Sequence, residues 1–135
     1  MLEVSVQLTV EKVVIMKSEL SFGEYVTERR KSLGITLRGM AGMINIAPAY
    51  LSDIEKGRRY PPDMEKLEAM VKVLKLNDEE RYILFDLAGQ GKNTVSPDLP
   101  EFIMEEDLVR VALRKAKAKG KLDEKVWKEL IEKLD

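Results

Sequence analysis

Residues 36–57 read TLRGMAGMINIAPAYLSDIEKG and are the most informative part of the chain about its fold. Its hydrophobic spacing predicts two short helices that are joined by a tight turn. Thr36 can cap the first helix, because its hydroxyl can accept a hydrogen bond from a free amide of the opening turn. Asn45 suits the turn, since asparagine tolerates a left-handed backbone, and Gly57 suits the end of the second helix. The stretch therefore predicts a helix-turn-helix unit.

The second of these helices has an inner and an outer face. Pro48 suits its first position, where the missing amide hydrogen of proline costs nothing. Leu51 and Ile54 are spaced to point at the core. The side chains that this arrangement turns outward are Ala49, Tyr50, Ser52, Asp53 and Lys56.

This stretch closely resembles the helix-turn-helix of the phage-repressor and Cro type, the XRE family. The resemblance rests on residues at fixed spacing, namely Thr36, Met40-Ala41, Asn45-Ile46, Leu51-Ser52-Asp53-Ile54, Glu55 and Gly57. It implies an all-α, five-helix lambda-repressor-like DNA-binding domain. It also implies that Arg30, on a preceding helix, forms an ion pair with Glu55. An ordinary helical hairpin is the alternative.

The candidate DNA-contacting residues follow from the resemblance and from side-chain chemistry. The family usually carries glutamine after the capping threonine as a phosphate contact; this chain has Leu37 there, and Arg38 can take its place. Ala49 can contact a thymine methyl group, and Asp53 can accept a hydrogen bond from cytosine N4. Tyr50 is expected to reach a phosphate oxygen or, alternatively, to pack on its own helix. The full predicted set is Arg38, Ala47, Pro48, Ala49, Tyr50, Ser52, Asp53, Lys56, Arg58 and Arg59.

Two arginines follow the second helix at once. Arg58 and Arg59 precede Pro61-Pro62, so they lie on a stiff loop that is well placed for the sugar–phosphate backbone. A solvated turn is the alternative interpretation of this loop.

The charge distribution agrees with a DNA-binding face. Residues 22–60 contain seven Lys/Arg and four Asp/Glu, a net charge of +3. Residues 61–108 contain five basic and twelve acidic residues, a net charge of −7, and residues 109–135 have nine against five, or +4. A basic unit beside an acidic flank would direct DNA to one face. The lysine-rich end is better explained as solvated helix surface.

Composition excludes several function classes. The chain has no cysteine and no histidine, which removes disulfides, thiolate metal sites and the usual general base near neutral pH. We therefore expect no enzyme activity, no metal site and no cofactor. No apolar run approaches the ~20 residues that span a bilayer, and residues 1–8 lack the basic start of a secretory signal. These features predict a cytoplasmic protein with no membrane partner.

The chain begins with a stretch of strict alternation. Residues 2–10 read LEVSVQLTV, in which every second residue is apolar, the period of a half-buried strand. An isolated strand is unstable, so this β-strand is expected to pair with its copy in a homodimer. The alternative is that Met16 is the natural start and the leader is incidental.

Helix signals on both sides of residues 36–57 set the predicted domain organisation. Residues 1–20 form the leader, and residues 21–89 form the DNA-binding domain, with helices that begin at Ser21, at Asp63 and at Asn77 or Asp78 and a last helix that stops at Gly89. Residues 90–100 are predicted to be a polar linker with Gly, Ser and Pro. Residues 101–135 form a C-terminal two-helix extension, which weakly resembles regulators whose C-terminal hairpin mediates oligomerisation.

Two function classes remain. The first is a sequence-specific regulator of transcription that binds double-stranded DNA as a dimeric repressor. The second is an antitoxin-like or protein-interaction module, in which the C-terminal helices bind a protein partner and DNA binding is secondary. Duplex binding with a steep salt dependence would favour the first class.

Overall fold

Eight helices account for the regular structure of residues 19–120 and 122–135, which are the residues that the computed structural model describes. In chain order they are α2 (Phe22–Ser32), α3 (Leu37–Met43), α4 (Pro48–Glu55), α5 (Met64–Val73), α6 (Asp78–Gly91), α7 (Pro100–Glu105), α8 (Asp107–Lys119) and α9 (Glu124–Leu134). These described residues contain no strand, so this part of the chain is all-α, as predicted. The predicted strand at residues 2–10 lies outside the described residues.

Side-chain caps begin helices α2, α3, α5 and α6. A side-chain oxygen accepts a hydrogen bond from the amide three residues later, over 2.9–3.2 Å, at Ser21, Thr36, Asp63 and Asn77. At α6 the Glu80 carboxylate also accepts from the Asn77 amide at 3.0 Å, which completes a capping box. The short helices α2, α3 and α5 therefore begin where their sequence predicts.

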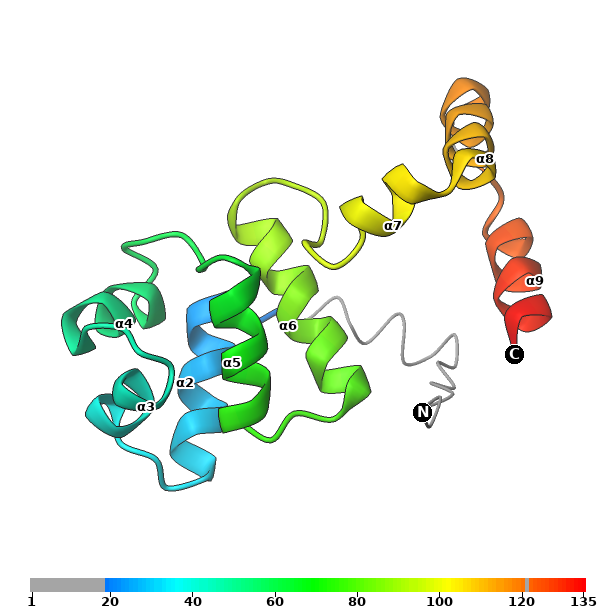
Figure 1. Ribbon diagram of the computed structural model, residues 1–135. Helices are drawn as coiled ribbons and strands as arrows, with labels where there is room; N and C mark the ends of the chain where they lie inside the picture. The colour runs from blue at the N-terminus through cyan, green and yellow to red at the C-terminus, as the bar shows by residue number, and fades with distance from the viewer. Residues whose placement is uncertain (1–18, 121) are drawn as a thin grey trace.

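Helices α2 to α6 enclose the hydrophobic core, with α3 and α4 side by side at one end of this body (Figure 1). The buried apolar side chains are Phe22, Val26, Met40, Ala41, Ile44, Leu51, Ile54, Leu67, Met70, Leu74, Leu84, Phe85, Leu87 and Ala88. The spacing of apolar residues predicts most of them. For α6 this spacing predicts an apolar stripe of Ile83, Leu84, Leu87 and Ala88. Phe85 lies outside that stripe but is fully buried, because α6 is covered by α2 and α5 and by the loop that follows it.

The turn between α3 and α4 has the predicted left-handed residue. Asn45 has a φ of 58°, and the backbone carbonyls of Ile44 and Asn45 accept hydrogen bonds from Lys66 Nζ of α5 at 3.1 and 3.4 Å. Gly57, with a φ of 74°, follows the end of α4. A residue with a left-handed backbone thus lies on each side of α4, and Lys66 supports the turn that precedes the helix.

An ion pair joins α2 to the end of α4, as the resemblance implies. Arg30 Nε and Nη2 donate to the two carboxylate oxygens of Glu55, each at 2.8 Å, and Arg30 Nη1 donates to the Ile35 carbonyl at 2.9 Å. Arg30 is only 7% exposed. The hydrogen bond from Arg30 to Glu55 raises the pKa of Arg30 above its ordinary value, so the guanidinium stays charged. Prediction and structure agree that this pair is structural.

The end of α6 differs from the sequence-based prediction. The helix does not stop at Gly89 but continues to Gly91, and the chain then turns back so that the Thr94 amide donates to the Gly89 carbonyl at 2.8 Å. A Cβ atom on Gly89 would lie 2.9 Å from the Ser96 amide nitrogen and from the Thr94 carbonyl oxygen. Gly89 therefore allows a close approach of the loop and does not end the helix. The Ser96 hydroxyl also donates to Asp86, which fixes the loop on α6.

The C-terminal extension has three helices and not the predicted two. The chain is extended at Glu106, with φ −110° and ψ 100°, which separates α7 from α8. The Arg110 side chain donates hydrogen bonds to the carbonyls of Ile103 and Met104. In a continuous helix these carbonyls would accept hydrogen bonds from backbone amides four residues later. Figure 1 shows α7, α8 and α9 leading away from the body that α2 to α6 form. None of the helices described here is long and apolar enough to cross a membrane.

Candidate nucleic-acid interface

Helix α4 is buried along one face and open along the other. Leu51 and Ile54 are buried in the core. Ala47, Pro48 and Ala49 are exposed at the start of the helix. No side chain caps this end, because Ala47 occupies the cap position. The first amides of α4 thus point to the surface with no side-chain acceptor, and helix starts of this kind suit anionic groups.

The remaining predicted residues on or near α4 also lie at the surface. Arg38 of α3 and Lys56 at the end of α4 are exposed, and Ser52 is half-buried. Leu37, which replaces the glutamine usual in the family, is half-buried against the core. An apolar side chain in that place cannot hydrogen-bond to a phosphate.

Asp53 lies within ion-pair distance of both loop arginines. Its Oδ1 is 3.9 Å from Arg58 Nη1, and its Oδ2 is 3.8 Å from Arg59 Nε. All three side chains are partly exposed, at 36% for Asp53, 68% for Arg58 and 60% for Arg59. Exposed pairs of this length contribute little to stability. They do place both guanidinium groups beside the outer face of α4 in this structure.

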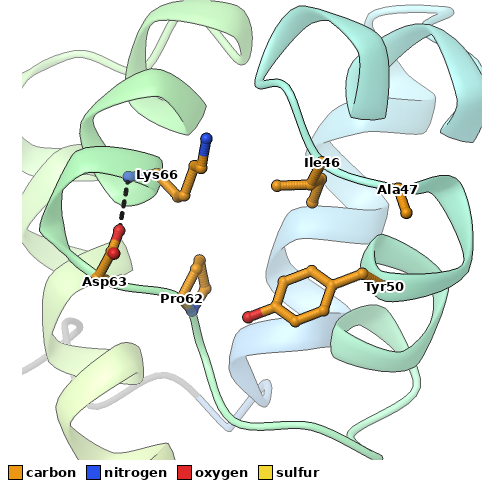
Figure 2. Close-up of a pocket in the computed structure, with 6 residues that line it drawn as sticks. All are labelled: Ile46, Ala47, Tyr50, Pro62, Asp63 and Lys66. Carbon is orange, nitrogen blue, oxygen red and sulfur yellow. Dashed lines mark hydrogen bonds between the residues drawn. The ribbon is translucent and has the colours of Figure 1, made fainter.

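Tyr50 is not a freely projecting side chain. Its half-buried ring packs against the core, and the guanidinium carbon of Arg59 lies 5.5 Å from the ring centroid, a cation–π distance. Figure 2 shows the ring directed from α4 toward Pro62, at the edge of an open cavity of about 350 Å³. The residues that line this cavity are Ile46, Ala47, Tyr50, Pro62, Asp63 and Lys66. The sequence-based alternative, in which Tyr50 packs on its own helix, misses the contact with Arg59 in the loop.

The loop after α4 is anchored at both ends. The Arg58 amide donates to the Asp53 carbonyl at 2.8 Å, and Pro61 and Pro62 are buried. A Cβ atom on Gly91 of α6 would lie 3.1 Å from the Pro61 ring, so the end of α6 packs closely on the loop. The loop is therefore held by contacts with α4 and α6 before it enters α5.

One supporting contact at this interface is not predicted by the sequence. Lys66 of α5 supports the turn between α3 and α4 through its bonds to Ile44 and Asn45. No local pattern indicates this contact, because it joins residues more than twenty positions apart. Among the described residues there is no cluster of three His, Cys, Asp or Glu side chains that could hold a metal ion.

Comparison with known families identifies this region. The helix-turn-helix family model matches residues 26–80, a segment that begins in α2 and ends in the first turn of α6. Residues 26–80 are a helix-turn-helix domain. The domain contains α3, the Asn45 turn and α4, together with the Arg58-Arg59 loop. It belongs to the XRE type that the sequence resembles.

One solved structure has a weak similarity to the whole chain. It is titled SinR protein/SinI protein complex and has 20% sequence identity over 84% of this chain and 93% of that chain, at a TM-score of 0.40. A likeness with a TM-score below 0.5 is too weak to carry an inference. No curated protein matches the chain.

Proposed function

We propose that this protein is a regulator of transcription that binds double-stranded DNA at specific sequences, acts as a homodimer and represses. The observation that supports this proposal best is the open face of α4 inside a helix-turn-helix domain, with Lys56, Arg58 and Arg59 beside it. In such domains the second helix lies in the major groove and the first helix crosses the backbone.

The roles of the side chains follow from this docking. Arg38, Lys56 and the two loop arginines would neutralise backbone phosphates, which gives affinity without sequence preference. Ala49 would contact a thymine methyl group and Asp53 would accept a hydrogen bond from cytosine N4. Ala47, Pro48 and Ser52 complete the surface that faces the duplex. Tyr50 would act by holding Arg59 through its ring.

A test of DNA recognition is selection of bound sites from a pool of random duplexes by the full chain. A shared sequence that is enriched over successive rounds would support the proposal, and a pool without enrichment would contradict it. The Arg58→Ala/Arg59→Ala double variant should bind both selected and random duplexes more weakly. Its salt dependence should be shallower by about 0.9 for each phosphate that the variant no longer neutralises. The matched control is Arg114→Ala/Lys115→Ala, which removes the same charge from exposed positions of α8.

The dimer is proposed on separate grounds. Two recognition helices about 34 Å apart would meet successive turns of the major groove, so the selected site should be two-fold symmetric. The alternating residues 2–10 are the proposed pairing segment. Deleting residues 1–15 should lower both dimer affinity and affinity for the selected site, as measured by sedimentation and by titration with duplex. A truncated chain that remains fully dimeric would contradict this role of the leader.

A second candidate function has an observation of its own. Most of the large apolar side chains that are exposed in the described residues lie in or beside α7, α8 and α9, and they include Phe102, Leu108, Trp127 and Leu134. Exposed apolar patches of this kind mark interaction surfaces. A protein-interaction module with secondary DNA binding would show duplex affinity that is absent or insensitive to salt.

A further inference from the structure

The two acidic residues of the segment 47–60 have different environments. Glu55 is turned inward and paired with Arg30, with only 6% of its side chain exposed. Asp53 lies on the outer side of α4, among residues predicted to face the duplex. It is the one carboxylate of this segment that a bound polyanion would meet directly.

Three contacts tie the loop arginines to α4. Arg58 and Arg59 approach the two different oxygens of the Asp53 carboxylate, at 3.9 and 3.8 Å. Arg59 also lies over the Tyr50 ring. Tyr50 and Asp53 are three residues apart and therefore share one side of the helix. In the free protein, both guanidinium groups thus lie against α4 beside a negative charge.

We propose that Asp53 is a specificity-determining residue that competes with backbone phosphates for Arg58 and Arg59. This inference rests on the proposed DNA-binding function. On a duplex of arbitrary sequence, Arg58 and Arg59 can bind backbone phosphates only if their ion pairs with Asp53 are weakened or broken. The Asp53 carboxylate is also repelled by the negative charge of the DNA. Binding to random DNA is weakened as a result.

The loss of DNA affinity caused by Asp53 is smaller on a site where a base can donate a hydrogen bond to its carboxylate. A cytosine in the major groove presents its N4 amino group as a hydrogen-bond donor, which a carboxylate can accept. Asp53 then accepts a hydrogen bond from the base in place of its ion pairs with Arg58 and Arg59, and both arginines can bind phosphates. The same carboxylate therefore lowers non-specific affinity while it favours one base at one position.

The decisive variant is Asp53→Asn, which keeps the size of the side chain and removes its charge. Titration of the full-length variant with a random-sequence duplex should show binding about fivefold tighter than that of the unmodified protein, the effect of one charge at about 4 Å in water. The salt dependence should become steeper by about 0.9 for each arginine released to a phosphate. Glu129→Gln on exposed α9 changes the net charge of the chain equally and should change neither quantity.

The possible results separate the inference from the function on which it rests. Unchanged affinity of Asp53→Asn for random duplex would overturn the inference, and so would weaker affinity, which would mean that Asp53 only supports the loop. If the unmodified protein binds no duplex at low salt, the proposed function itself fails. On the selected site, the expected result for Asp53→Asn is a smaller ratio of specific to random affinity.

Discussion

Replacing Gly23 with alanine should disrupt the contact between α2 and α4. Gly23 lies in the first turn of α2 and is buried, and a Cβ atom built on it would lie 2.3 Å from the Glu55 carbonyl oxygen and 2.6 Å from that of Ile54. Both obstacles are backbone atoms, which cannot rotate away as a side chain can. The end of α4 must therefore move.

The size of the effect follows from this geometry. Ordinary contact begins at 3.4 Å, so the two helices must separate by about 1 Å at their closest point. Overpacking of this kind costs about 1–3 kcal/mol of unfolding free energy, while the better helix propensity of alanine returns at most ~1 kcal/mol. The movement also disturbs Glu55, whose carboxylate accepts two hydrogen bonds from Arg30. We expect a net loss of about 2 kcal/mol or more.

Gly42 supplies a matched control. It also lies in a helix, α3, but a Cβ atom there would meet nothing within 4 Å. Gly42→Ala should therefore raise stability by about 0.5–1 kcal/mol. Urea unfolding of both variants and the unmodified protein, followed by circular dichroism, measures the difference. If Gly23→Ala proves as stable as Gly42→Ala, the close crossing of α2 and α4 is refuted.

Three further predictions concern single side chains. Arg30→Ala leaves the Glu55 carboxylate buried without its partner and should lower the unfolding free energy by about 3–5 kcal/mol; an unchanged thermal midpoint would contradict this. Tyr50→Phe keeps the ring beneath Arg59, so affinity for random duplex should stay within about twofold, whereas a larger decrease would mean that the hydroxyl contacts DNA. Burial raises the pKa of Tyr25 to about 12, because the folded protein favours the neutral phenol. The stability that this shift contributes is complete below about pH 10 and is lost as the pH rises through about 12. Tyr25→Phe should therefore show a smaller fall in unfolding free energy over this pH range, and equal falls in both proteins would exclude the effect.

Features that depend on neighbouring residues could be predicted from the sequence. The caps at Thr36 and Asp63 and the left-handed turn at Asn45 are each set by the chemistry of one side chain and the backbone beside it. The division of α4 into a buried and an open face follows from the helical spacing of its apolar residues, Leu51 and Ile54. The Arg30–Glu55 pair was predicted only through family resemblance, because the two residues are far apart in the chain.

Prediction was wrong where a local signal has two physical meanings. A glycine can end a helix or allow a close approach, and at Gly89 the structure shows the close approach. A continuous apolar pattern from residue 102 to residue 116 indicates one helix, but it does not show the break at Glu106. That break is made possible by Arg110, whose side chain bonds the carbonyls left free at the end of α7.

Capping, turn geometry and helical period act over a few residues, so the helix-turn-helix unit, the order of its helices and the outward side of α4 could all be predicted from the sequence. The arrangement of side chains on the open face of α4 depends instead on tertiary packing. The loop after α4 returns to the helix, where the Arg58 amide donates to the Asp53 carbonyl, and its two prolines, Pro61 and Pro62, are buried. This return brings Arg58 and Arg59 to Asp53 and places Arg59 over the Tyr50 ring. Contacts of this kind depend on how the chain packs in space, which residue spacing along the sequence does not encode.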